Sequence, residues 1–176
     1  MRHLLQVGLV AVCMVAFTTP IKAVSLNGLV EKYKYDFTLL GYVKVFSASL
    51  YASSEVSLIE FPGEYEFALR FDYHRNISRR ELVKRGNAAL EAQFDSETLS
   101  AFGDELTEIN AAYENVGKGD FYTLRFKPEE GLILFRNENS VLAIENDAFA
   151  KFYLSIWLGE STPNQSIRKS LIPTPE

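Results

Sequence analysis

The chain has 176 residues and a formal net charge of −5, with 47% apolar and 23% charged residues. This length suits a single domain, and 13 Phe and 9 Tyr give it more apolar surface than a disordered chain carries. One Cys excludes a disulfide scaffold and a cysteine-based zinc cluster, and an acidic balance without a basic run argues against nucleic acid as a partner.

Residues 1–23 have the pattern of a secretory signal peptide. Arg2 supplies the positive start, residues 4–17 are apolar except for one Gln, and Pro20 precedes a small residue at Ala23. The apolar stretch is too short to span ~30 Å of hydrocarbon. We therefore expect cleavage near Ala23 or Ser25, a single domain over residues 24–176, no integral membrane segment after cleavage, and a periplasmic or secreted protein.

Removal of the predicted signal peptide changes the charge and the chemistry of the chain. The basic count falls from 18 to 16 against 23 acidic residues, so the net charge becomes −7. The only cysteine, Cys13, is also removed. We therefore expect a mature protein without thiol chemistry or disulfides, which is held together by packing.

The first part of the mature chain is typical of β-structure. Residues 33–54 are rich in β-branched and aromatic side chains, which predicts two strands or one long bent strand with Gly41 at the bend. A turn follows at residues 61–64. Residues 65–73 alternate between aromatic or apolar and polar side chains, which predicts a half-buried strand.

Two helices are predicted next. Ser78 with Glu81 three residues later forms a capping-box pattern, and apolar residues follow at helical spacing up to Phe94. Ser96 or Thr98 begins another helix, whose apolar positions repeat every three or four residues until the stop at residues 117–120.

The last part predicts three strands and two helices. The strands cover residues 121–127, 132–136 and 140–145, and their connections are short enough for antiparallel hairpins. Asn146 or Asp147 caps a strongly apolar helix over residues 148–158, Gly159 is expected at its C′ position, and residues 164–171 form a short helix. The whole pattern predicts one α+β domain with helices on one side of a mainly antiparallel sheet.

Several segments resemble the bacterial chalcone isomerase-like family. Residues 43–51 (VKVFSASLY) are similar to its K-V-Y-x-A-x-L-Y strand, and residues 68–77 (ALRFDYHRNI) to its L-x-x-x-Y-x-R-x-I strand end. Lys118-Gly119-Asp120 resembles a K-G-D entry to a strand, and residues 149–159 resemble an F-A…I-W-L-G helix, followed by RKSL at residues 168–171. The resemblance implies an open-faced β-sandwich, a long antiparallel sheet covered on one face by helices.

The resemblance also implies where a ring-closing site would lie. Plant chalcone isomerases use an Arg, a Thr, a Tyr and an Asn around the ligand. Alignment on the first strands puts Lys34 at the Arg position and Phe46 at the Thr position, while the Tyr position falls on Arg79 or Arg80 and the Asn position on Gly86 or Asn87. Because Phe46 cannot donate a hydrogen bond, the sequence predicts a protein without this isomerase activity.

Fatty-acid-binding members of the same fold offer another interpretation, since they are implied to grip a carboxylate with an Arg and a Tyr. Lys34 would supply the charge, and the hydroxyl would come from Tyr33, Tyr35 or Tyr73. Phe46, Leu50, Phe71, Phe152 and Trp157 would line the tail pocket. The predicted ligand-binding residues are Lys34, Phe46, Tyr73, Arg79, Arg80 and Asn87. The alternative is that Lys34 is a solvated strand-edge residue and that the aromatics form the core.

Other motif residues have structural interpretations. Arg75 either binds an anion with the helix N-terminus or pairs with a carboxylate such as Asp120 or Asp147, which we favour. Gly119, Asp120, Trp157 and Gly159 complete this structural set. His74 has no second His or Cys in the mature chain, so no metal site is predicted, and no cofactor is expected.

Three functions follow from these observations. The first is an exported, non-catalytic domain that binds a small apolar or amphipathic ligand, such as a fatty acid. The second is an intramolecular lyase or isomerase with rearranged donors. The third is a periplasmic interaction protein without a ligand.

Overall fold

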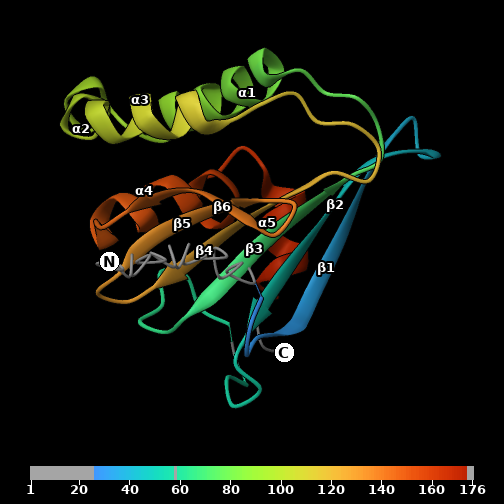
Figure 1. Cartoon of the computed structure of the whole chain (residues 1–176), viewed down its shortest axis with the longest axis horizontal. Helices are drawn as coiled ribbons and strands as arrows, with labels where there is room; N and C mark the ends of the chain where they lie inside the picture. Colours follow the sequence, from blue (N-terminus) through green and yellow to red (C-terminus); the bar gives the residue numbers. More distant parts are fainter. Residues whose placement is uncertain (1–25, 58, 174–176) are drawn as a thin grey trace, which may run out of the picture.

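A six-stranded antiparallel sheet is the centre of the fold (Figure 1). The computed structural model describes residues 26–57 and 59–173. The strands are β1 (Val30–Leu39), β2 (Val43–Ala52), β3 (Phe67–Tyr73), β4 (Phe121–Lys127), β5 (Gly131–Arg136) and β6 (Asn139–Ile144). They pair in sequence order, each with the next, so the sheet is a simple meander with one helical excursion.

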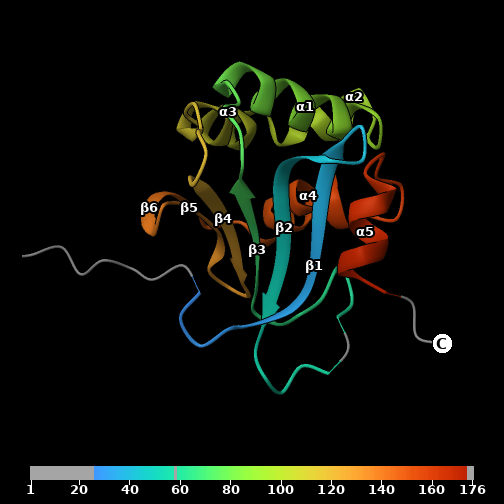
Figure 2. The same cartoon turned by 90° about the vertical axis from the view of Figure 1, so that its right-hand side faces the viewer.

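The helices fall into two groups (Figure 2). Between β3 and β4 the chain forms α1 (Arg79–Glu91), α2 (Ser96–Ala101) and α3 (Gly103–Ala112). After β6 it forms α4 (Asp147–Leu158) and α5 (Gln165–Leu171). Helix α4 packs against β4 and β5, α5 packs against β1, and α1 packs on α4. Ile77 and Val116 exchange backbone hydrogen bonds of 2.9 and 3.0 Å, which close the base of the α1–α3 excursion.

The core lies on the helix-covered face of the sheet. Because side chains alternate along a strand, Leu50, Leu69, Leu124 and Leu134 come from four strands to this one face, each at most 1% exposed. Helix α4 lies between this face and α1, so it is apolar around most of its circumference. This burial of α4 explains why the sequence shows an almost continuous apolar run there.

Most of the predicted elements are confirmed, including the α+β class. The Ser78 hydroxyl accepts a bond from the Glu81 amide at the start of α1, and Asn146 caps α4 in the same way through the Phe149 amide. Gly41 lies in the turn between β1 and β2, where Leu40 (φ 55°) and Gly41 (φ 79°) both adopt left-handed conformations. This pair of positive φ values is the arrangement of a type I′ turn.

Two details of the prediction are wrong. The second helix is not continuous, because Phe102 leaves helical geometry and separates α2 from α3. Gly159 does not end α4 in a left-handed conformation, since its φ is −66°. The absence of a side chain at Gly159 instead lets Ser155 and Gln93 approach closely, because a Cβ there would lie 2.9 Å from Ser155 O and from Gln93 Oε1.

The predicted signal peptide, residues 1–23, lies outside the described residues. Within residues 26–57 and 59–173, no helix combines the length and apolar character needed to cross a membrane.

Candidate ligand-binding cavity

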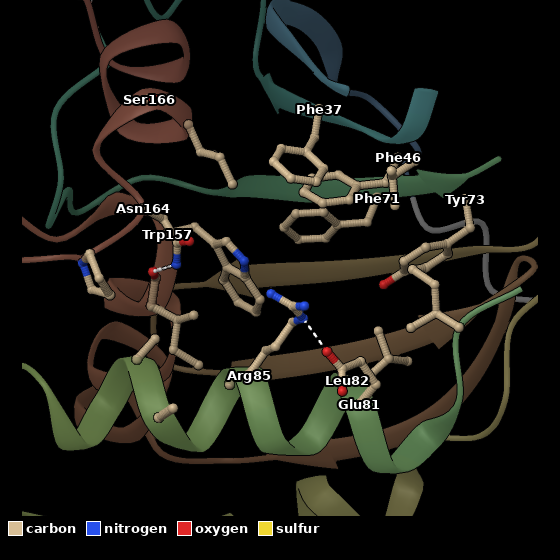
Figure 3. A pocket seen from close by; sticks show the side chains of 18 of the residues that line it. Phe37, Phe46, Phe71, Tyr73, Glu81, Leu82, Arg85, Trp157, Asn164 and Ser166 are labelled. Atoms are coloured by element: carbon tan, nitrogen blue, oxygen red, sulfur yellow. Dashed lines mark hydrogen bonds and ion pairs between the residues drawn. The ribbon is translucent and has the colours of Figure 1, made fainter. Parts of the chain in front are cut away.

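A cavity of about 950 Å³ lies between the sheet and the helices (Figure 3). This volume is at the upper end of the range for small-molecule sites. Strands β1–β3 form one wall, α1 the opposite wall, and the end of α4 with the segment leading into α5 the third. The lining residues used below are Tyr35, Phe37, Phe46, Phe71, Tyr73, Ser78, Glu81, Leu82, Arg85, Gly86, Ala89, Ile156 and Trp157.

The sheet wall of the cavity is a row of aromatic rings. Phe37 of β1 stacks on Phe46 of β2 with 5.1 Å between ring centroids. Phe46 meets Phe71 of β3 edge-on at 5.8 Å, and Phe71 contacts Trp157 of α4 at 4.9 Å. The row follows from strand pairing, because Phe46 is the register partner of Phe37 and side chains of paired residues share a face. The wall is therefore continuous and apolar.

The α1 wall follows the helical repeat. Residues 78, 81, 82, 85, 86 and 89 line the cavity, spaced by three and four positions. Two of them, Gly86 and Ala89, are small, and a Cβ built on Gly86 would meet nothing closer than Ile156 Cδ1 at 3.8 Å. The small side chains keep α1 from filling the space above the aromatic row.

One ion pair faces the cavity from α1. Arg85 Nε donates to Glu81 Oε1 over 2.6 Å, across one helical turn. In a capping box the Glu81 carboxylate would turn back to the Ser78 amide, but here it accepts from Arg85. Figure 3 shows the Arg85 guanidinium directed between α1 and the aromatic row. The side chains are 78% and 41% exposed, so both reach solvent.

Tyr73 brings a hydroxyl into the same cavity. Its side chain comes from the end of β3, is 6% exposed, and points its oxygen into the space in Figure 3. Burial, with the neighbouring Tyr113 and Tyr122, raises the pKa of Tyr73 well above its ordinary value, so the phenol is neutral. The neighbouring hydroxyls have partners: Tyr122 accepts from the Glu114 amide at 2.8 Å, and Tyr113 bonds Tyr153 at 3.1 Å.

Comparison with known proteins gives the family. The sequence pattern described as chalcone isomerase-like matches residues 23–172. The chain belongs to the chalcone isomerase-like family. Among solved structures, it is similar to a fatty-acid binding protein of Arabidopsis thaliana, with a TM-score of 0.56 and 13% identity over 84% of this chain and 85% of that one. At this identity the likeness shows the shared fold. No curated protein sequence matches significantly.

Within this chalcone isomerase-like fold, two of the six predicted ligand-binding residues line the cavity. Phe46 lies in the aromatic row and Tyr73 supplies the hydroxyl. Lys34 does not reach it, because it pairs with Ser49 on the opposite face of the sheet and is exposed. Its neighbour Tyr35 lines the cavity instead. Because side chains alternate along a strand, the consecutive residues Lys34 and Tyr35 lie on opposite faces of the sheet.

The three predicted residues of α1 lie outside the cavity lining. Arg79 Nη2 donates to Asn110 O at 3.0 Å, and Asn87 Oδ1 accepts from Asn110 Nδ2 at 3.2 Å, so both connect α1 to α3. Arg80 is exposed. Gly86, the alternative considered for the Asn position, does line the cavity. The helix is predicted correctly, but the sequence alignment does not show which of its residues face the cavity.

The motif residues around β3 and β4 hold a turn. Gly119, at φ 95°, donates its amide to Tyr73 O, and Asp120 accepts from the Gly117 amide at 2.8 Å and from Asn137 Nδ2 at 2.7 Å. These bonds, the one from Asn137 first, lower the pKa of Asp120. Arg75 was expected to pair with Asp120 or Asp147, but it is exposed and Asp120 has Arg136 nearby at 3.9 Å instead.

The sequence does not predict the ion pair of the cavity. The capping-box pattern predicts only a helix start for Glu81, and it predicts no role for Arg85. The signal was available, because Glu81 and Arg85 are four residues apart with the acidic residue first, the spacing that favours an ion pair on a helix. The spacing does not show whether this pair faces the cavity or the opposite side of α1.

Proposed function

We propose that the protein is an exported, non-catalytic domain that binds a fatty acid or a similar amphipathic carboxylate in this cavity. The observation that carries the proposal is the apolar cavity of about 950 Å³ between the aromatic row and α1. A continuous apolar wall with a few polar groups suits a chain-like ligand with one polar end. The similarity to a fatty-acid binding protein of the same fold supports this choice of ligand.

The absence of isomerase activity in this proposal rests on Phe46. The family resemblance implies a hydroxyl donor at this position, where negative charge would develop during ring closure. Phe46 faces the cavity but has no hydrogen-bond donor. Loss of one such donor typically costs about 3 kcal/mol of transition-state stabilisation.

The proposed binding is tested on protein purified from its own host. Native mass spectrometry should find a co-purifying lipid, and palmitate added to the delipidated protein should raise its melting temperature. Gly86→Phe should abolish the palmitate response, because the new ring fills the space left by a glycine that lines the cavity. Lys84→Phe is the matched control, since it adds the same ring to an exposed position of the same helix.

The proposal fails if the delipidated protein shows no palmitate-induced stabilisation, or if Gly86→Phe and Lys84→Phe respond to palmitate equally. Export is tested separately by N-terminal sequencing of the protein from its host. The proposed signal cleavage predicts a start within about two residues of Val24, and a start at Met1 or Arg2 would contradict it.

Tyr73 favours a second candidate, an intramolecular lyase or isomerase. A neutral phenol that points into an apolar cavity can donate to a developing oxyanion. Turnover of a chalcone by the wild-type protein, lost in Tyr73→Phe while the variant stays folded, would support this candidate over simple binding. Equal and negligible turnover by both would remove it.

A further inference from the structure

The charges around the cavity differ from those of a simple acid-binding pocket. Among the described residues that line it, Arg85 is the one cation and Glu81 the one anion, and they are joined to each other. A carboxylate that enters this cavity therefore meets a cation that already has a counter-ion. The carboxylate of the ligand and that of Glu81 therefore compete for the Arg85 guanidinium.

We propose that Glu81 and Arg85 form the head-group subsite of the cavity, in which the Glu81 carboxylate occupies Arg85 until the carboxylate of the ligand displaces it. This inference rests on the proposed function and assigns residues to its polar end. The guanidinium has several donors in a planar fork, so it can hold a ligand carboxylate by two parallel bonds. Glu81 then rotates to solvent, which its 41% exposure permits.

Tyr73 lies across the cavity from this pair. Its hydroxyl and the Arg85 guanidinium both point into the space, the first from β3 and the second from α1 (Figure 3). Among the described residues, none forms a hydrogen bond with the Tyr73 hydroxyl, although its side chain is more than nine-tenths buried. Because the oxygen opens to the cavity, it is available to a polar atom of a ligand. The neutral phenol donates to an acceptor without adding charge repulsion to a carboxylate.

The local sequence explains why the pair is present at this place. Ser78 caps α1 through the Glu81 amide at 3.2 Å, so the backbone of residue 81 is fixed at the first turn. Its side chain points along the cavity side of the helix, and Arg85 follows one turn later on the same side. Arg80 is a useful comparison, because it has the same charge on the same helix but does not line the cavity.

The test compares palmitate with methyl palmitate, which has the same chain and no charge. Arg85→Gln should weaken palmitate binding roughly five- to tenfold through loss of a charged hydrogen-bond donor, and leave methyl palmitate within about twofold. Glu81→Gln should tighten palmitate binding roughly two- to fivefold, because removing an exposed ion pair frees Arg85. Arg80→Gln controls for the change in net charge and should leave both ligands unchanged.

Two results would overturn the subsite. The first is palmitate binding that Arg85→Gln weakens no more than Arg80→Gln does. The second is a Glu81→Gln variant, shown to be folded by circular dichroism, that binds palmitate more weakly than the wild type. In both cases the proposed function would stand, with the carboxylate of the acid held by other groups of the cavity. If neither palmitate nor methyl palmitate binds the wild-type protein, the proposed function and the subsite are both rejected.

Discussion

Tyr73 and Tyr122 give a matched pair of substitutions that tests the site without knowledge of the ligand. The two rings pack edge to face at 6.4 Å between centroids, and both side chains are almost fully buried. The Tyr122 hydroxyl accepts a 2.8 Å bond from the Glu114 amide. The Tyr73 hydroxyl opens to the cavity. Replacement by Phe removes only the oxygen in each case, so ring packing is conserved.

The expected free energies of unfolding differ. Tyr122→Phe leaves the Glu114 amide without its acceptor and should cost about 1 kcal/mol, a fall in melting temperature of about 2–4 °C for a chain of this size. Tyr73→Phe breaks no protein hydrogen bond and should change the free energy of unfolding by less than about 0.5 kcal/mol. Urea unfolding of the ligand-free protein measures both values. An equal loss of stability in the two variants would refute the assignment of the Tyr73 hydroxyl to the cavity.

Three further predictions concern the fold. Leu40→Gly should stabilise the protein by about 0.5–1 kcal/mol in urea unfolding, because Leu40 is 76% exposed and held at φ 55°. The control Leu39→Gly, in β1, should destabilise the protein. Gly86→Ala should add about 0.5–1 kcal/mol, since its Cβ has 3.8 Å of space; a loss would show that the helix position is strained. Burial raises the pKa of Tyr113 and Tyr153 above the ordinary 10.0, so the stability they contribute is complete below about pH 10 and falls as pH rises further. Unfolding free energies that stay constant from pH 9 to 11 would contradict this.

The strands and helix starts could be predicted because their signals are local. Alternation along residues 65–73 reflects one buried face, and the caps at Ser78 and Asn146 depend only on residues within one turn. The break at Phe102 could not be predicted in this way. The apolar repeat continues through it, and Phe102 leaves the helix while its ring stacks on Phe152 of α4 at 4.6 Å.

The candidate site was predicted less completely because it depends on register and rotation. Phe46 and Tyr73 were found, since they belong to strands with a clear alternation. Lys34 was chosen in place of Tyr35, and a shift of one residue moves a side chain to the other face of the sheet. On α1, Arg79 and Arg80 were chosen in place of Glu81, which lies one position further along the helix. Which side chains of a strand or helix line the cavity depends on how three elements pack together. The sequence of one element alone does not determine this.

The most direct test of ligand binding uses Trp157, the only tryptophan in the chain, which lines the cavity beside Phe71. A dibrominated stearic acid quenches a tryptophan only at short range, whereas stearic acid does not quench. If the fatty acid occupies the cavity, the brominated acid quenches Trp157 in a saturable way, stearic acid competes the effect away, and Gly86→Phe removes it while Lys84→Phe does not. Binding detected by a melting shift without quenching of Trp157 would place the ligand elsewhere and contradict the account.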